Sequence, residues 1–352
     1  MLFMVQHVLS EGATHYNRVI GPVVIIAVLC LVQAGVKRLG GLGGVLYALT
    51  YMPSLILLAG LTCVDNSFTD MPIGGARLLV LLALLVVYVA ASLMLKFGGS
   101  VWYSVANDGI IGSLWKNLLC MAGMFLVVAL CSNTDSTFHY RLRVERLLSA
   151  GSYGKALQVG EKSDDADASL TMLRIYALSK SRQMGERLFE YPLVGGSSAL
   201  LPDGNDVRCL YYPEDAVFKS LSIRKKGVMS PMEYLLYIER HGLALKPVAD
   251  YILCGYLLDK DLDGFVNAIR HKYNLTSASL PKHYKEALTL YTHLRANPVL
   301  VYHSEVMDAD YADFQKILKS YPDKREREAY VRDTYGSTYW FYYFFHDEDG
   351  GR

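Results

Sequence analysis

The charged residues of this 352-residue chain are distributed so unevenly that they limit its possible folds more than any other feature. Residues 1–134 contain six Lys or Arg and four Asp or Glu, out of 35 and 34 in the whole chain. Residues 135–352 hold all the others, at the charge density of an ordinary soluble domain. The sequence therefore predicts two domains in different surroundings, and it argues against a disordered chain or a purely soluble one.

Apolar residues dominate four stretches of the first domain, residues 1–134. The stretches cover 19–36, 45–63, 76–95 and 114–131. Crossing a bilayer core of about 30 Å takes roughly 20 apolar residues in helical form, and helices that are apolar on all sides are rare in soluble proteins. We therefore expect a four-helix transmembrane bundle embedded in the membrane lipid bilayer.

The few basic residues of this domain predict its orientation. Lys37 and Arg38 follow the first stretch, whereas the connector between the second and third stretches has no basic residue before Arg77. Because basic connectors stay in the cytoplasm, both the N-terminus and the tail are expected on the outer side. No stretch has an ionisable side chain at its centre, so an anchor is favoured over an ion pathway.

The pattern changes to short helices in the second domain, residues 135–352. Apolar residues recur there every three or four positions, interrupted by Gly, Pro and acidic turns, and strand signals are few. This predicts an all-α fold in which a soluble α-solenoid of helical hairpins follows the bundle. The insertion at 193–213 is the one long non-helical segment, and either a functional loop or a linker fits it. The aromatic run at 335–345 is expected to be a helix capping the solenoid, with docking to lipid headgroups or a partner as alternatives.

One segment of the tail resembles a known repeat. In RLLSAGSYGKALQ, residues 146–158, Gly151 separates two helices, and Tyr153 and Ala156 lie near the start of the second. This resembles the tetratricopeptide repeat, in which a turn, an aromatic residue and a small alanine allow two helices to pack closely. Gly160 departs from the pattern, because it occupies a usual aromatic position.

The resemblance extends to a second segment and to the layout of the whole chain. YLLDKDLDGFVNAI, residues 256–269, repeats the pattern at an ungapped offset of 109 residues, and the resemblance covers 138–192 and 247–297. A multi-span segment followed by such a tail also resembles uncharacterised membrane proteins of Bacteroidales-type bacteria. That resemblance implies a bacterial inner membrane and a periplasmic tail, without any activity.

Motifs for catalysis, cofactors or metals are missing from the sequence. The nine histidines are scattered, and no nucleophile elbow, phosphate loop or dinucleotide fingerprint occurs. Asp259–Gly264 imitates the start of a calcium loop, but the twelfth position needs Glu and holds Arg270. We therefore expect no catalytic residues, cofactor or metal. Enzymatic activity is disfavoured without being excluded, and the pairing of Cys209 with Cys254 stays open.

These observations favour a membrane-anchored helical-repeat scaffold at the cell envelope. Stacked hairpins form concave surfaces, so another envelope protein or peptide is the expected partner. The formal net charge of +1 argues against nucleic acid. If the repeat register is correct, the groove would present Arg141, Glu145, Asp250 and Cys254.

A second hypothesis is a membrane enzyme, or an accessory subunit of a membrane enzyme or transport complex. Its site would lie where the bundle meets the tail. A polar pocket joining His139, Arg143 and the 193–213 loop would favour it.

Overall fold

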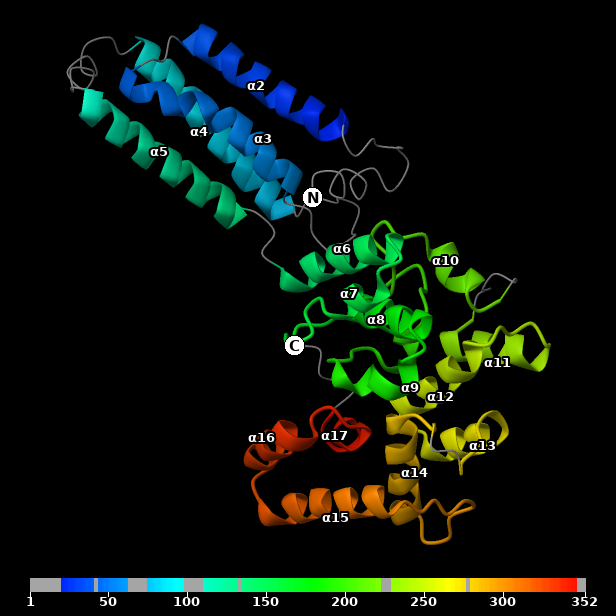
Figure 1. The fold of residues 1–352 in the computed structure, drawn as a ribbon. Coiled ribbons are helices and arrows are strands. Elements are labelled where there is room, and N and C mark those ends of the chain that lie inside the picture. Colours follow the sequence, from blue (N-terminus) through cyan, green and yellow to red (C-terminus); the bar gives the residue numbers. More distant parts are fainter. Residues whose placement is uncertain are drawn as a thin grey trace. The chain divides into compact units, whose positions relative to one another are not determined.

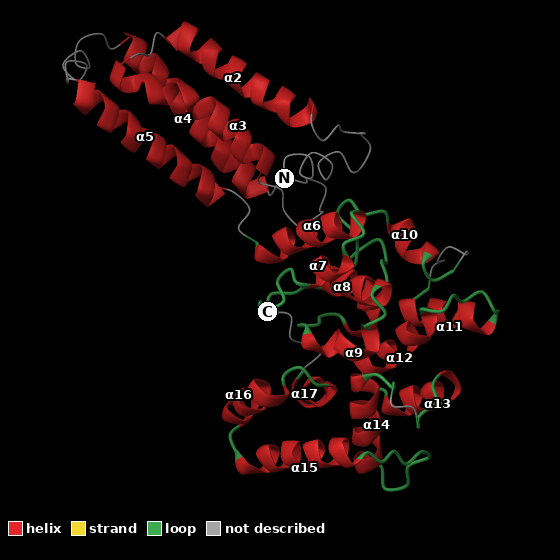
Figure 2. Cartoon of the chain, in the orientation of Figure 1, coloured by secondary structure: helices red, strands yellow, loops and turns green. Residues whose placement is uncertain are grey.

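The computed structural model describes residues 20–40, 44–62, 75–97, 110–131, 135–222, 229–276 and 279–346. The chain divides into two compact units, which we name unit 1 (residues 1–138) and unit 2 (residues 139–352). Within the described ranges all regular structure is helical, apart from one isolated bridge between Ser222 and Ala244 (Figure 2). An all-helical fold is thus confirmed for those ranges.

Unit 1 is a bundle of helices (Figure 1). Its elements are α2 (Ile20–Gly40), η1 (Gly44–Tyr51), α3 (Met52–Thr62), α4 (Gly75–Phe97) and α5 (Ile110–Cys131). The 3-10 helix η1 packs on α5, and α3 contacts α2, α4 and α5.

Polar side chains connect the helices of unit 1 from within. The Gln33 side chain donates to the Thr50 hydroxyl at 3.0 Å, and the Ser54 hydroxyl donates to the Leu29 carbonyl at 2.8 Å. The backbone N–H of Ala48 donates to the Asn117 side chain at 2.8 Å, which ties η1 to α5. Thr50 and Ser54 are buried. A hydrogen bond in apolar surroundings is strong, so these few contacts fix how the helices pack.

Apolar side chains, in contrast, are exposed along α2, α4 and α5. Examples are Val23, Leu31, Leu79, Val86, Met94, Ile111, Leu118 and Phe125. Unit 1 therefore buries polar groups next to a few apolar ones, such as Ile56 and Met124, and exposes many apolar side chains at its surface.

The prediction of four transmembrane helices is wrong. None of the helices in the described ranges offers the apolar length that crossing a bilayer requires. The second predicted span, 45–63, is divided between η1 and the short α3. Basic residues shorten the apolar part of two others, because α2 ends with Lys37 and Arg38 and α5 contains Lys116. The transmembrane bundle, the inner-membrane localisation and the periplasmic placement of the tail are corrected accordingly.

Unit 2 is a succession of short helices (Figure 1). Its first part contains α6 (Ser136–Ser149), α7 (Tyr153–Leu157), α8 (Ala168–Lys180), α9 (Met184–Arg187), η3 (Leu188–Glu190), η4 (Gly196–Leu200) and α10 (Glu214–Lys219). Its second part contains α11 (Pro231–Arg240), α12 (Val248–Leu258), α13 (Leu262–Lys272), α14 (Lys282–Leu294), α15 (Glu305–Ser320), α16 (Lys324–Tyr335) and α17 (Tyr339–Phe345).

One hydrophobic core runs through unit 2, from Val144 to Tyr342. Helices α8 and α12 lie deepest, since almost every residue of each is buried. Helix α14 packs on α9, α13, α15 and α17, and thereby joins the two parts of the unit.

Three hairpins of unit 2, and the turn that follows α11 at Gly242, share the same backbone geometry. In the turns α6–α7, α8–α9 and α12–α13, one residue has a positive φ: Gly151 at 68°, Arg182 at 56° and Lys260 at 57°. Each turn also has the paired hydrogen bonds of a Schellman motif; in the first, Ser152 N–H donates to Leu147 and Gly151 N–H to Leu148. The left-handed conformation is therefore retained even where the residue is not glycine.

The aromatic run at the end of the chain forms helix α17. Tyr339, Trp340 and Tyr342 are buried. The Trp340 indole donates to the Glu286 carbonyl at 2.8 Å, and the Tyr342 hydroxyl donates to the Leu258 carbonyl at 2.8 Å. The run thus closes the core of unit 2, as expected for a capping helix.

Candidate functional site

Two of the predicted groove residues, Arg141 and Glu145, are buried on α6. Arg141 forms an ion pair with Asp167 at 3.1 Å and donates to the Arg208 carbonyl at 2.9 Å. The Glu145 carboxylate accepts the backbone N–H groups of Leu210, Tyr211 and Tyr212 at 2.7 to 2.8 Å. Both side chains therefore hold the 193–213 loop against α6.

The electrostatics of Glu145 are set by two opposing causes. Burial raises the pKa of this carboxyl group, while the three N–H donors and Arg141 act to lower it. Removing the carboxylate would leave the three N–H groups without their acceptor.

The other two predicted groove residues, Asp250 and Cys254, lie on α12. Asp250 is half-buried and accepts hydrogen bonds from the hydroxyls of Tyr273 at 2.6 Å and Tyr284 at 2.9 Å. Cys254 is buried next to the Tyr284 hydroxyl, and burial raises the pKa of its thiol. All four residues thus make contacts within unit 2, and partner binding at them stays a prediction.

The residues of the alternative hypothesis lie elsewhere on the same helix. Arg143 is exposed and His139 is half-buried. The 193–213 loop is instead held by Arg141 and Glu145. Cys209 and Cys254 are both free thiols, so they are not paired.

The acidic turn Asp259–Gly264 has a structural role. Asp261 caps α13 by accepting the Gly264 N–H at 2.8 Å, and Asp259 accepts the Ser197 N–H at 2.8 Å. Asp263 forms an ion pair with Arg295 at 2.6 Å. The three carboxylates of this turn therefore bind three different groups of the chain, at Gly264, Ser197 and Arg295.

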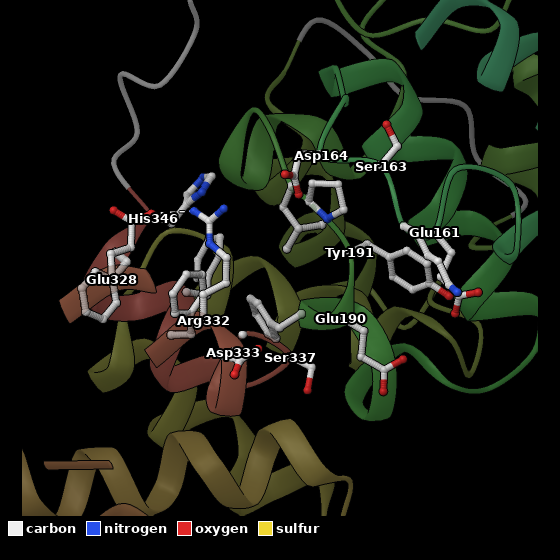
Figure 3. A pocket seen from close by; sticks show the side chains of 18 of the residues that line it. Glu161, Ser163, Asp164, Glu190, Tyr191, Glu328, Arg332, Asp333, Ser337 and His346 are labelled. Carbon is white, nitrogen blue, oxygen red and sulfur yellow. Dashed lines mark hydrogen bonds and ion pairs between the residues drawn. The ribbon is translucent and has the colours of Figure 1, made fainter. Parts of the chain in front are cut away.

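A cavity of about 690 Å³ lies within unit 2 between segments far apart in the sequence. One side, the hairpin wall, consists of residues 161–164 and 189–194; the other, the C-terminal wall, lies within 328–346. Figure 3 shows side chains of both walls, with Glu161, Asp164 and Tyr191 on one and Arg332 and Asp333 on the other.

Five Phe and Tyr residues take part in the cavity lining. The hairpin wall contributes Phe189 and Tyr191, and the C-terminal wall contributes Phe341, Tyr342 and Phe345. Phe189, Tyr191 and Tyr342 are buried, so the accessible aromatic area of the lining comes from Phe341 and Phe345, which are half-buried.

A guanidinium group organises the hairpin wall. Arg187 donates to Glu190 at 2.7 Å and to Glu161 at 3.0 Å. The same guanidinium lies 5.7 Å from the centre of the Tyr191 ring. Its hydrogen bond to Glu190 raises the pKa of Arg187.

Buried Arg174 joins the two segments of this wall. It donates to the carbonyls of Gly160 at 3.0 Å and Pro192 at 3.4 Å, and lies 5.3 Å from the centre of the Tyr191 ring. Desolvation lowers the pKa of Arg174.

In the C-terminal wall, too, a guanidinium group lies between a carboxylate and an aromatic ring. Arg332 donates to Glu328 at 2.5 Å and lies 5.6 Å from the centre of the Phe341 ring. The His346 ring stacks on Tyr342, with the ring centres 4.5 Å apart. Each wall thus holds one guanidinium between carboxylate and aromatic groups.

A buried histidine and glutamate connect the two walls behind the cavity. His283 accepts the Phe189 N–H at 3.3 Å through Nε2, so its Nδ1 carries the proton and donates to Glu286 at 2.9 Å. The Glu286 carboxylate also accepts the Tyr339 N–H at 2.7 Å. Sequence reasoning missed this pair, because its three-residue spacing on one helix was the only pattern that could have indicated it.

Comparison with known proteins gives one match. A model of a family of unknown function (DUF6057) matches residues 233–346, which run from α11 to the end of α17. No curated protein and no solved structure matches the chain. The match includes the C-terminal wall of the cavity and leaves out the hairpin wall.

Proposed function

We propose that unit 2 is a scaffold of tetratricopeptide-like helical hairpins that binds a protein partner at the cavity. The observation that carries this proposal is the cavity itself, where aromatic rings and ion pairs from two distant segments surround one space. Protein recognition commonly places aromatic anchors inside a polar rim.

The shared turn supports the repeat character of the scaffold. Gly151 and Lys260, the left-handed residues of the first and third hairpins, are separated by the 109 residues at which the sequence pattern repeats. Because the same bonds close both turns, these hairpins have equivalent geometry at the point where a repeat family needs its sharp turn.

The proposal can be tested by photo-crosslinking in the native host. A benzoylphenylalanine would replace Ser337, which is exposed at the cavity, and in a control chain Asn267, which is exposed on α13. We expect one protein to be crosslinked from position 337 and not from position 267. Filling the cavity with Thr334→Trp should remove that product.

Two results would count against a partner site. One is the same set of products from both positions, and the other is a product from position 337 that persists in the Thr334→Trp chain.

A further inference from the structure

We propose that His283 and Glu286 on α14 form a pH-sensitive latch between the two walls of the cavity. The latch is closed while His283 is neutral, and the hairpin wall is released when His283 takes up a second proton. The loss of a bound partner on acidification, which follows from this release, rests on the proposed function.

Each residue of the latch bonds to one wall. His283 Nε2 accepts the Phe189 N–H of the hairpin wall at 3.3 Å. In the segment of the C-terminal wall, the Tyr339 N–H donates to the Glu286 carboxylate at 2.7 Å, and the Trp340 indole donates to the Glu286 carbonyl at 2.8 Å. His283 is 0% exposed and Glu286 is 1% exposed. A change in the protonation of His283 therefore alters a contact that holds the hairpin wall.

The second proton has one place to bind on His283. Its Nδ1 already carries a proton and donates to Glu286 at 2.9 Å, so the second proton must go to Nε2. Nε2 is the atom that accepts the Phe189 N–H. Once Nε2 is protonated, two donors face each other, and the buried Phe189 N–H loses its acceptor. Protonation therefore breaks the contact that fixes the hairpin wall.

The attraction between protonated His283 and Glu286 does not keep the latch closed. The two residues lie three positions apart on α14, so their ion pair persists when the hairpin wall moves away. The bond to Phe189 exists only in the closed state, and opening gives the buried charge access to water. Because the open state binds the second proton better, the equilibrium shifts towards opening as the pH falls through the ordinary titration range of histidine, at about pH 6.5.

The charged groups beside the latch on α14 and α9 bond to other parts of the chain. Lys282 Nζ lies 3.9 Å from the Glu286 carboxylate and donates to the Ser337 carbonyl at 3.1 Å. The Glu186 carboxylate on α9 accepts the backbone N–H of Lys282 at 2.9 Å. None of these contacts involves the Phe189 N–H, so among these groups only His283 links proton uptake to that bond.

The titratable groups of the two walls are also engaged elsewhere. Arg187, two positions before Phe189, pairs with Glu190 at 2.7 Å. Burial raises the pKa of the Tyr339 hydroxyl well above its ordinary value, so this group stays neutral at acidic pH. The His346 ring stacks on Tyr342 in the C-terminal wall, and substitutions at position 283 separate its titration from that of the latch.

Hydrogen exchange of the full chain at about pH 7.5 and about pH 5 tests the latch. The readout is the protection factor of the Phe189 amide, the ratio of its intrinsic to its observed exchange rate, which removes the pH dependence of the exchange chemistry. We expect this factor to fall by about tenfold or more on acidification, because uptake of one proton on opening changes the equilibrium by up to about tenfold per pH unit. The amide of Leu253, deep in α12, should keep its protection. An unchanged protection factor at Phe189 would overturn the latch.

Two substitutions of His283 separate the acceptor from the proton. His283→Gln places an amide oxygen near the position of Nε2 and does not titrate, so Phe189 should stay protected at both pH values. His283→Asn keeps a donor for Glu286, but its shorter side chain offers no acceptor to Phe189, so the protection should be low at both.

A matched control removes another histidine from the same helix. His293 is exposed on α14 and stacks on Tyr311, away from both walls, so His293→Gln should keep the pH response of the unaltered chain. An equal fall of Phe189 protection in His283→Gln and in the unaltered chain would overturn the latch, because a different group would then cause the response.

Photo-crosslinking connects the latch to the partner. With benzoylphenylalanine at position 337, the crosslinked product should decrease several-fold between about pH 7.5 and about pH 5, and it should persist in the His283→Gln chain. A product that stays constant while Phe189 loses protection would overturn the regulation of partner binding. If position 337 crosslinks no protein at either pH, the proposed function fails, whereas the exchange of Phe189 still decides the latch.

Discussion

Unit 1 and unit 2 distribute polar and apolar side chains in opposite ways. In unit 1, Thr50 and Ser54 are buried, while aliphatic side chains are exposed along three helices. In unit 2, the interior is aliphatic and aromatic, and the charged residues that enter it, such as Glu145 and Glu286, are hydrogen-bonded. Unit 2 is therefore held together by burial of apolar area, and unit 1 combines a small apolar cluster around Ile56 with a few polar contacts between its helices.

The difference also shows what each surface is suited to. Apolar faces as extensive as those of α2, α4 and α5 normally pack against another apolar surface. The surface of unit 2 instead has a cavity lined by charged and aromatic side chains, the site at which we propose that a partner binds.

The largest effect is expected from the same substitution made in both units. Phe314 in unit 2 is 0% exposed and packs against Trp340, whereas Phe125 in unit 1 is 55% exposed. Phe314→Ala should lower the free energy of unfolding by about 3 to 5 kcal/mol, because it leaves a cavity in the core. Phe125→Ala should change it by less than about 0.5 kcal/mol. Chemical denaturation measures the free energy of unfolding of both variants. Equal losses would refute the proposed difference in packing between unit 1 and unit 2.

A second large effect is expected at the buried carboxylate of unit 2. Glu145→Ala should lower the free energy of unfolding by about 3 kcal/mol, because three backbone N–H groups lose their acceptor. Hydrogen exchange at Leu210–Tyr212 should accelerate strongly. Arg143→Ala, on the exposed face of the same helix, serves as the control and should leave that exchange unchanged.

The polar contacts of unit 1 predict a smaller effect. Asn117→Ala should destabilise the packing of η1 on α5 by about 1 to 2 kcal/mol, since the buried N–H of Ala48 loses its acceptor. Asn117→Asp keeps an acceptor oxygen and should restore most of the protection of Ala48 in hydrogen exchange. An unaltered Asn117→Ala protein would show that apolar packing alone holds unit 1.

The smallest effects concern the shared turn of unit 2 and have opposite signs. Arg182→Gly should raise the midpoint of thermal unfolding, because glycine adopts the left-handed backbone conformation at this position without strain. The strain removed corresponds to about 1 kcal/mol of unfolding free energy. Gly151→Ala should lower it by a similar amount, and no neighbouring atom within 4 Å adds a steric cost there. A lower midpoint in Arg182→Gly would mean that the Arg182 side chain stabilises the fold by more than the strain of its left-handed backbone destabilises it.

The predicted groove illustrates how far sequence reasoning reached. The helical period identified α6 and α12. The direction in which a side chain points depends on the exact register of the helix, because a shift by one residue rotates the side chain by about 100° around the helix axis. Arg141 and Glu145 were expected at a surface and are buried against the 193–213 loop. Their polar character did not indicate burial, because the groups that compensate for it lie far along the chain: Asp167 is 26 positions from Arg141, and the carbonyl of Arg208 and the N–H of Leu210 are more than 60 positions away.

By itself, the sequence determined what depends on neighbouring residues: the helical period of residues 135–352, the turn at Gly151 and the contrast in charge at residue 134. Apolar composition alone led to the incorrect transmembrane spans. Only the tertiary structure decided which charges are buried and where the cavity lies. Its walls, near residues 161–194 and 328–346, are brought together by α14 and α17 through packing that no local pattern encodes.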